Sequence, residues 1–391
     1  MARFKTTSED SFFGGFLYDQ VLDQNHFLVR AKREIDWGEL SSGFEIAYKG
    51  GGEYGPTPYD PALLLRYLLI PYLFNISERE AEDVVRHNLL AKYFVGLGVD
   101  QLPPDHSTLT VFKRRLGKIK GQSVWERLLN RVLKQASQKG IVFGSIQIID
   151  STHTTANVNQ EKDRQRTKEG KPPRDQEARG GVKRVKTKTV IDAFTKRKVM
   201  VKDPVRIYGY KAHVSLNQET GLVTSAIVTP ANEADTNQFI PLVEKDRQKN
   251  LPVKTVTADK GYDDGNNHTF CEVRRITPAI ILKKTRAAPR WVELRNKPSY
   301  QQATRLRPRI EAKFGQIKVN HGFSHCRYLG LTNYKTQTFL TMITVNLKRI
   351  MSLTQTLPSF PAQVKLAYAR TPVLPRGQCH PKVSPYPYGR N

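Results

Sequence analysis

The stretch Ser-Ile-Gln-Ile-Ile-Asp at residues 145–150 decides the fold. It is short, apolar and rich in β-branched residues, which is typical of a strand buried inside a sheet, and it ends in a carboxylate. A second run, Val253–Asp259, has the same character and also ends in an acid. Between them, residues 209–217 alternate apolar and polar side chains, and residues 222–229 return after a turn. This pattern predicts an antiparallel hairpin.

Helical and strand patterns follow in an order that defines the fold class. We expect a helix over Thr236–Asp246, a short strand over Ala279–Leu282, and a closing helix over about Tyr334–Ser352. Strand, hairpin, helix, strand, strand and helix together describe an α/β protein with a mixed sheet flanked by helices. The interval from Asp259 to Glu311 is short, so we expect no large inserted β domain there.

The part before this sheet has helix signals, and we expect an α-helical domain over residues 1–140. Asp60 precedes Pro61, Ser77 and Glu80 have the spacing of a capping box, and Asp105 or Ser107 can cap a third helix that carries exposed lysine and arginine. Short helices of this kind fit a helix-turn-helix-like DNA-binding domain. They fit an ordinary small bundle almost equally well, and the sequence leaves both readings open.

We expect the domain that contains the sheet to cover residues 141–353, with one less regular segment inside it and another after it. Residues 157–200 are polar and basic and predict a flexible basic insertion, because long connections inside a compact domain are either functional or mobile. Residues 354–391 contain several prolines and few apolar runs, which predicts a loosely ordered C-terminal tail.

The net charge of the chain restricts the class of partner that it can bind. Lysine and arginine exceed aspartate and glutamate by 63 to 36 in 391 residues, a net charge of +27, while 38% apolar residues allow a large core. A charge of this size favours a polyanionic partner, with nucleic acid first. No apolar run approaches the ~20 residues of a spanning helix, and no signal peptide opens the chain, so we expect a cytoplasmic, nucleoid-associated protein without a membrane partner. Three widely spaced cysteines exclude a disulfide framework and a CxxC zinc site.

Residues 306–318, Leu-Arg-Pro-Arg-Ile-Glu-Ala-Lys-Phe-Gly-Gln-Ile-Lys, predict a helix that begins at Pro308, with Arg307 as a capping or pre-helical residue. Apolar side chains at 310, 314 and 317 form one stripe that must dock on the rest of the protein. Glu311 and Lys318 lie at the edge of that stripe. We therefore expect the carboxylate of Glu311 to point along the docking seam.

Three acids thus stand at structural junctions: Asp150 and Asp259 at strand ends and Glu311 on a docking helix. Carboxylates that are buried together repel one another unless a cation offsets the cost. With no thiol or histidine cluster nearby, the cation is expected to be Mg²⁺ or Mn²⁺, bound through oxygen. Two such ions about 4 Å apart suit phosphodiester chemistry.

Other candidate ligands have simpler explanations. Asp263 and Asp264 lie in a turn, where aspartate is common for local hydrogen bonding, and capping explains Asp235. His153 and His213 lie near strand ends, and isolated histidines of this kind are more often hydrogen-bonded structural residues.

These motifs together resemble bacterial insertion-sequence transposases of the DDE class. The first is Ile-Ile-Asp-Ser-Thr at 148–152, the second Thr-Ala-Asp-Lys-Gly-Tyr-Asp at 257–263, and the third Arg307-x3-Glu311-x6-Lys318, which is similar to the family's YREK signature. Tyr-Lys-Ala-His at 210–213 and Thr-Pro-Ala-Asn-Glu at 229–233 resemble the family's hairpin, and residues 58–116 its usual helical domain. The likeness spans roughly residues 40–352, with four separated motifs in the family's order.

The resemblance implies a ribonuclease-H-like catalytic domain, with Asp150, Asp259 and Glu311 holding two metal ions. It implies that Arg307 and Lys318 contact DNA phosphates near the cut. The signature tyrosine, three residues before Arg307, is Thr304 here, and Tyr300 is a candidate source of the ring.

The expected function is that of a DNA transposase that binds its element's terminal inverted repeats, hydrolyses phosphodiesters at the ends and transfers the strands into target DNA. The partner is double-stranded DNA, both element ends and target, and a homodimer is expected because two ends must be held together. Lys211, Lys260 and Lys313 are further candidate phosphate contacts. The alternatives are a nuclease of the same fold that never joins strands, and an inactive relative that binds DNA as a regulator.

Overall fold

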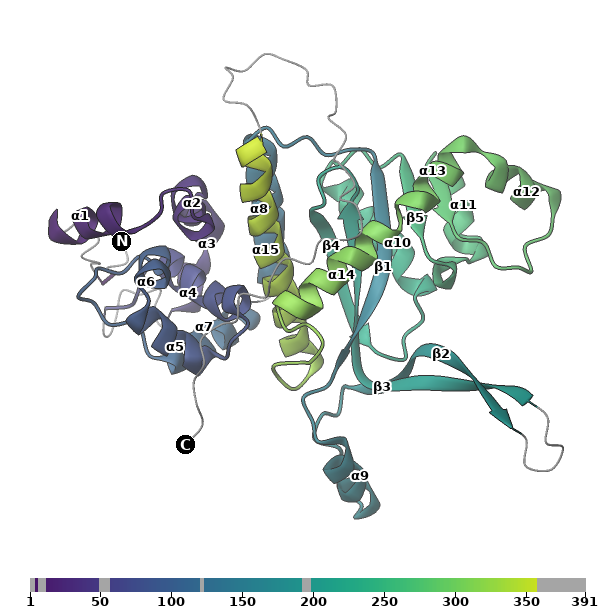
Figure 1. Cartoon of the computed structure of the whole chain (residues 1–391), viewed down its shortest axis with the longest axis horizontal. Coiled ribbons are helices and arrows are strands. Elements are labelled where there is room, and N and C mark those ends of the chain that lie inside the picture. The colour runs from purple at the N-terminus through teal and green to yellow at the C-terminus, as the bar shows by residue number, and fades with distance from the viewer. Residues whose placement is uncertain (1–3, 6–11, 49–56, 120–122, 192–197, 357–391) are drawn as a thin grey trace. The chain divides into compact units, whose positions relative to one another are not determined.

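The computed structural model describes residues 4–5, 12–48, 57–119, 123–191 and 198–356. Before the first strand, the described regular elements are all helical (Figure 1). They are α1 (Phe12–Val21), α2 (Phe27–Glu34), α3 (Trp37–Ser41), the 3-10 helix η2 (Phe44–Ala47), α4 (Pro61–Phe74), α5 (Glu78–His87), α6 (Leu89–Val95), α7 (His106–Gly117) and α8 (Val124–Gln138).

A mixed sheet follows. Its strands are β1 (Ile146–Thr155), β2 (Arg179–Ile191), β3 (Lys198–Asn217), β4 (Val223–Pro230), β5 (Thr255–Ala258) and β6 (Thr277–Ile280). β1 pairs antiparallel with β3 on one side and parallel with β5 on the other, β3 pairs antiparallel with β4, and β5 pairs parallel with β6. The resulting path β4-β3-β1-β5-β6 is that of a ribonuclease-H-like sheet. The predicted fold class is therefore confirmed.

The remaining elements cover the sheet or extend from it. They are α9 (Gln160–Lys168), α10 (Thr236–Gln248), the 3-10 helix η4 (Lys260–Tyr262), α11 (Gly265–Val273), α12 (Pro289–Asn296), α13 (Pro298–Leu306), α14 (Pro308–Asn320) and α15 (Leu331–Thr356). Between residues 260 and 310 the only strand is β6, so no large β domain is inserted there, as expected.

Ile148 and Ile149 show how the strand organises the fold, because successive side chains of a strand point to opposite faces. Ile148 belongs to the larger core, which also contains the apolar stripe of α14 and residues of α4, α8 and α15. Ile149 belongs to a second core with residues of α10, α11 and β5. A buried run of six residues therefore supplies both layers, which explains its lack of alternation.

Several helix starts follow the sequence signals. The side chain of Asp60 caps α4, and Asp105 rather than Ser107 caps α7. Ser77 and Glu80 form the expected capping box: Ser77 Oγ accepts from the Glu80 backbone N–H at 3.2 Å, and Glu80 Oε2 accepts from the Ser77 N–H at 2.7 Å. A cap of this kind contributes about 1 kcal/mol.

The insertion after β1 has more regular structure than its composition suggested. The chain forms α9 and then β2, which pairs with the first half of β3 from Ile191↔Lys198 to Arg179↔Gly209. Residues 192–197 lie outside the described residues. Strand pairing satisfies backbone groups between distant positions, and local composition does not report it. The expected lack of regular structure was therefore wrong, while flexibility of the insertion stays a prediction.

By internal contacts, the described residues, which end at Thr356, form one compact unit. The larger apolar core is continuous from the N-terminal helices to one face of the sheet. The proposed boundary near residue 140 stays a prediction, and most of the expected C-terminal tail lies outside the described residues. Within the described residues, no helix is long and apolar enough to span a membrane.

Gly209 shows how tightly β1 and β3 approach. A Cβ atom there would lie 2.2 Å from the carbonyl oxygen of Thr154, whereas a Cβ at Gly180 meets nothing within 4 Å. We expect Gly209→Ala to destabilise the protein by about 2 kcal/mol, since backbone must shift to admit the methyl group. Gly180→Ala is the matched control and should leave the unfolding midpoint in urea unchanged. Equal midpoints for the two variants would contradict the close approach.

Candidate active site

Asp150 and Asp259 are brought together by the parallel pairing of β1 and β5. The register joins Ile148 to Thr257 and Ile149 to Ala258, so the two aspartates occupy the next positions on neighbouring strands. Alternation along β1 places Asp150 on the face of Ile148, which is the face that α14 covers. Figure 1 shows α14 passing beside β1. The sequence therefore identified a pair of acids that the sheet places side by side. The expected strand end at Asp150 was wrong, because β1 continues to Thr155, whereas Asp259 directly follows β5.

Asp150 lies in an unusual environment for a carboxylate. Its side chain is only 17% exposed, and its Oδ1 accepts from the Ser151 backbone N–H at 2.7 Å. Burial raises the pKa of Asp150 to about 7, and the nearby charges of Asp259 and Asp235 add to that rise. The Ser151 N–H and the Arg307 guanidinium oppose it. A buried acid whose negative charge is insufficiently compensated is a natural ligand for a cation.

Arg307 connects this acid to Glu311. One guanidinium nitrogen lies 3.5 Å from Asp150 Oδ2, and the other lies 2.6 Å from Glu311 Oε1. The helix α14 begins at Pro308 and Arg307 occupies its N-cap position, as expected. Arg307 nevertheless has α-helical backbone angles and joins α13 directly to α14. Its side chain forms no helix cap and instead reaches across to β1. The apolar stripe at 310, 314 and 317 is buried as expected.

The three predicted acids converge without forming a closed cluster. Glu311 is 53% exposed, and the three carboxylates do not all lie within 4.8 Å of one another. Arg307 stands between two of them and supplies the positive charge there. The guanidinium group of Arg307 therefore already offsets part of the negative charge of Asp150 and Glu311. The three acids offer only carboxylate oxygens, which are the ligands that Mg²⁺ and Mn²⁺ prefer. The residues present fit a hard divalent ion.

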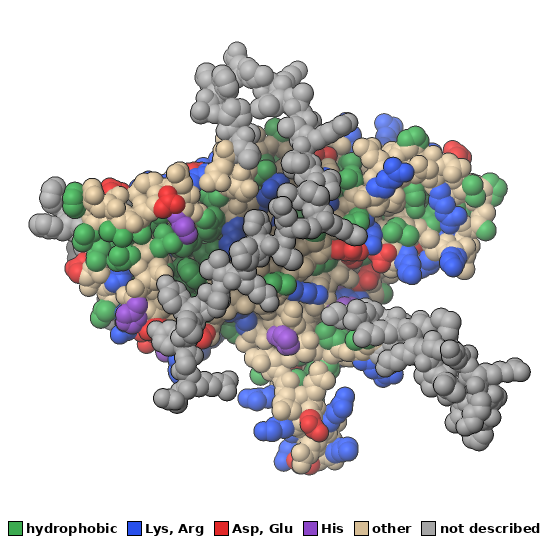
Figure 2. All heavy atoms as spheres, in the orientation of Figure 1, with side chains coloured by type: hydrophobic (Ala, Val, Ile, Leu, Met, Phe, Trp, Pro, Cys, Tyr) green, Lys and Arg blue, Asp and Glu red, His purple; other side chains and the backbone are tan. Residues whose placement is uncertain are grey.

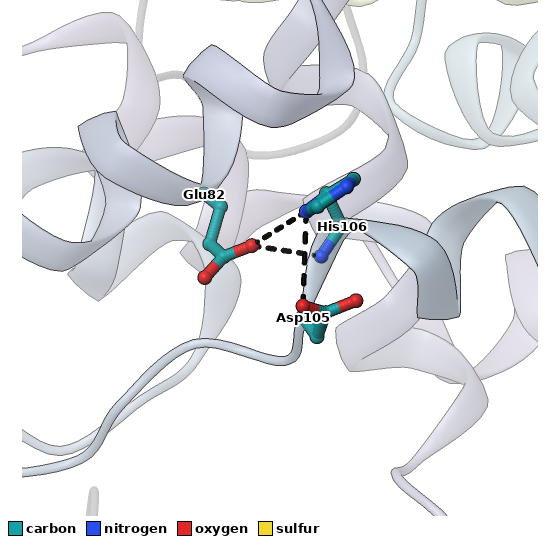
Figure 3. A group of neighbouring side chains, drawn as sticks. All are labelled: Glu82, Asp105 and His106. Carbon is teal, nitrogen blue, oxygen red and sulfur yellow. Dashed lines mark hydrogen bonds and ion pairs between the residues drawn. The ribbon is translucent and has the colours of Figure 1, made fainter.

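Among the described residues, one group does meet that distance criterion, and it lies elsewhere. Figure 3 shows Glu82 of α5 facing Asp105 and His106 at the start of α7. Glu82 Oε2 accepts from the His106 backbone N–H at 2.9 Å and contacts the His106 ring at the same distance, while Asp105 caps the helix. Helix capping and the contacts of the His106 ring with both carboxylates explain the group, so nothing further is assigned to it.

Asp235 is a fourth acid beside the site, and sequence reasoning missed it. Its Oδ1 accepts from Ser151 Oγ at 3.1 Å and from Lys211 Nζ at 2.9 Å, and its side chain makes no helix-capping hydrogen bond. The capping explanation was therefore wrong. Lys211, which was expected to contact a DNA phosphate, is only 7% exposed. Its Nζ also donates to the Glu233 carbonyl at 2.7 Å. It compensates Asp235 inside the protein. This pairing follows from the β3–β4 hairpin, which brings the start of α10 back beside Lys211.

His213 and Tyr262 are two buried residues next to these acids. His213 is fully buried, its Nε2 lies 2.9 Å from Thr229 Oγ1, and burial lowers its pKa to about 4. It is a neutral, hydrogen-bonded structural residue, as the sequence suggested. Burial raises the pKa of Tyr262 well above its ordinary value, and the charges of Asp235, Asp150 and Asp259 act in the same direction.

The remaining predicted cations lie around the acids. Lys260 is exposed next to Asp259, Lys318 is half-buried at the end of α14, and Lys313 is half-buried, with a pKa lowered to about 8 by burial and by Arg349. Tyr300 does not replace the missing signature tyrosine in this conformation, because it is buried and its hydroxyl donates to the Ile280 carbonyl at 3.0 Å.

Comparison with known proteins gives two family matches. The family described as Transposase DDE domain matches residues 142–347, more than half of the chain, and the family described as Transposase domain (DUF772) matches residues 16–115. The first match contains the sheet and all three predicted acids. The second contains helices α2 to α6 and most of α7.

Three solved structures are similar at low scores. The Mos1 transposase paired-end complex with left transposon end is 12% identical, with a TM-score of 0.19, over 69% of this chain and 82% of that chain. A pre-cleavage Mos1 transpososome is 11% identical, with a TM-score of 0.22, over 77% and 97%. The Mos1 mariner paired-end complex with Mn is 13% identical, with a TM-score of 0.19, over 83% and 94%. Likeness at these scores carries no weight for function.

Proposed function

Because this chain belongs to the DDE transposase family, we propose that it binds the terminal inverted repeats of an insertion sequence, hydrolyses the phosphodiesters at the element ends and joins the freed 3′-hydroxyls to target DNA. The observation that carries the proposal is the convergence of Asp150, Arg307 and Glu311 in one chain of ion pairs, with Asp259 next to Asp150. Acids placed in this way have no evident structural purpose, since they raise the cost of folding.

Asp150, Asp259 and Glu311 are the residues that would hold two divalent ions, Mg²⁺ or Mn²⁺. Such ions, when bound, activate an attacking oxygen and stabilise the leaving oxygen of a phosphodiester. Glu311 is 53% exposed and is held by its ion pair with Arg307, whereas the pairing of β1 with β5 positions Asp150 and Asp259. Lys211 fixes Asp235, and Ser151 links that acid back to β1.

Arg307 has two sets of anionic partners. In the DNA-free protein it pairs with Asp150 and Glu311, and its proposed role in the reaction is to bind a phosphate near the cut. Guanidinium groups suit both, because they pair with carboxylate and phosphate oxygens in the same planar geometry. Lys260, Lys313 and Lys318 are the proposed neighbouring phosphate contacts. The net charge of +27 favours the same partner.

The helical region matched at residues 16–115 is proposed to recognise the element ends. Lys113 of α7, expected to be exposed, instead pairs with Glu78, and its Nζ donates to Tyr328 Oη at 2.7 Å, so it ties this region to the rest of the chain. Arg114 and Arg115 are exposed on the same helix. We propose that two copies hold two ends in the synaptic complex, and that the protein acts on chromosomal DNA in the cytoplasm.

Strand joining separates this proposal from a nuclease of the same fold. The full-length protein, Mn²⁺, a labelled duplex carrying the inverted repeat and a supercoiled plasmid should together give labelled plasmid. The expected result is joined product only with repeat DNA. Cleavage without joined product would identify a nuclease, and metal-independent binding without nicking would identify a regulator. Either outcome overturns the proposal.

A further inference from the structure

A cavity outside the candidate active site lies between α9 and strands β2 and β3. Its volume is about 730 Å³, which is within the ~300–1,000 Å³ of sites that bind small organic groups. The residues that matter are Asp163, Arg164 and Lys168 of α9, Gly180 of β2, and Arg206 and Tyr208 of β3. Figure 1 shows α9 beyond the end of β1. No part of the proposed cleavage reaction uses this cavity.

Asp163 lines this cavity, and one of its carboxylate oxygens lacks a hydrogen-bond donor among the described residues. The residue is 8% exposed, and its Oδ1 accepts from the Arg174 backbone N–H at 3.0 Å. Its Oδ2 is buried and has no hydrogen-bond partner among the described residues. A buried carboxylate oxygen without a donor is costly, so its presence indicates a ligand that supplies an N–H or O–H group.

The other side chains of α9 indicate an anion. Of the helix's residues only Asp163 is buried, and the helix has no apolar face to dock on another protein. Arg164 and Lys168 are exposed beside Asp163, and Arg206 is exposed on the facing strand. Figure 2 shows lysine and arginine side chains around this lower projection of the molecule. The ligand therefore combines a hydrogen-bond donor with negative charge.

Tyr208 adds a planar surface. Its hydroxyl donates to the Asp175 carbonyl at 2.8 Å, which fixes the position of a half-buried ring in the cavity wall. An aromatic ring, a carboxylate acceptor and three cations correspond to the three parts of a nucleotide: the flat base, the polar base edge and the phosphate.

We propose that this cavity binds one unpaired nucleotide of a DNA strand, with an exocyclic amino group of the base donating to Asp163 Oδ2 and the flanking phosphates on Arg164, Lys168 and Arg206. Asp150 and Thr155 are five positions apart on β1, which corresponds to roughly 17 Å. A strand held at the candidate active site would run along β1 toward this cavity. That placement rests on the proposed function, whereas nucleotide binding itself does not.

The test is fluorescence anisotropy of the full-length, metal-free protein with 5′-labelled dC10 and dT10. Cytosine presents an amino group where thymine presents a carbonyl, so dC10 should bind roughly five- to tenfold more tightly. Asp163→Asn keeps the Oδ1 acceptor but turns an amide donor toward the base, and it should abolish or reverse the preference. Gly180→Leu should weaken dC10 binding roughly tenfold by filling the cavity.

Arg164→Gln and Arg166→Gln form a matched pair, because both arginines are exposed on α9 and only Arg164 lines the cavity. Arg164→Gln should weaken dC10 binding more. Equal affinity for dC10 and dT10, or equal loss in the matched pair, overturns the proposal. So does binding of dCMP as tight as that of dC10, which would make this a mononucleotide site. Binding of dC10 is measured without metal and without cleavage, so failure of the cleavage proposal is detected separately.

Discussion

Asp259→Asn is expected to lower the rate of end cleavage by at least about a thousandfold while leaving affinity for repeat DNA within about twofold. Asparagine has the shape of aspartate but lacks the negative charge that a divalent ion requires. Loss of the several kcal/mol of transition-state stabilisation that metal ions supply corresponds to a factor of this size. Cleavage of labelled repeat duplex in Mg²⁺ measures the rate, and gel mobility in EDTA measures the binding.

Asp264→Asn is the matched control for this experiment. Asp264 lies five residues further along the chain, and its side chain caps α11 by accepting from the Asn266 backbone N–H at 2.9 Å. Asparagine caps equally well, so this variant should cleave normally. If Asp259→Asn also loses DNA binding, or if it unfolds in circular dichroism, the acid has a structural role and the catalytic assignment fails.

The sequence predicted the strands β1 and β5 and the adjacent positions of Asp150 and Asp259, because local residue patterns indicate both. β1 and β5 have buried, β-branched runs, and the stripe on α14 has helical spacing, so each element could be identified alone. The end of the first strand could not, because the polar residues that follow Asp150 in β1 pair with β3. The register of β1 against β5 then follows from the fold. The partners of these acids could not be identified in the same way. Arg307 reaches Asp150 across 157 positions, and Lys211 meets Asp235 only once β4 has paired with β3 and α10 has begun.

Local sequence patterns and local geometry both suggested roles that the tertiary contacts do not support. Asp235 precedes a helix, where capping is the usual role, yet its side chain turns to Ser151 and Lys211. Composition described α9 and β2 as a basic loop, because strand pairing between distant positions leaves no local signal. In contrast, Glu82, Asp105 and His106 have the geometry of a metal group and are explained by capping. Tertiary contacts therefore decide each role.

The buried charge of Asp150 has a consequence for stability. The pKa of this carboxyl rises from 3.8 to about 7 in the folded protein, mainly through burial. The folded state therefore holds a proton that the unfolded state has already lost between these values. The contribution of Asp150 to the free energy of unfolding is therefore complete below pH 3.8. It falls as the pH rises toward 7 and does not change further above that pH. Asp150→Asn cannot ionise, so it should be more stable than the unaltered, metal-free protein at pH 8, by up to about 4 kcal/mol.

Thermal unfolding in EDTA at pH 5 and pH 8 measures this difference, and the gap between the two proteins should widen with pH. Asp263 provides the opposite case: it is also buried, but the Lys283 backbone N–H, the ring of His268 and Arg286 hold its pKa below the ordinary value. Asp263→Asn should therefore destabilise the protein at pH 8. If Asp150→Asn lowers the unfolding temperature as Asp263→Asn does, Asp150 is compensated like any structural acid. A gain in stability would instead mark Asp150 as an acid that the fold tolerates for the sake of the cation it binds.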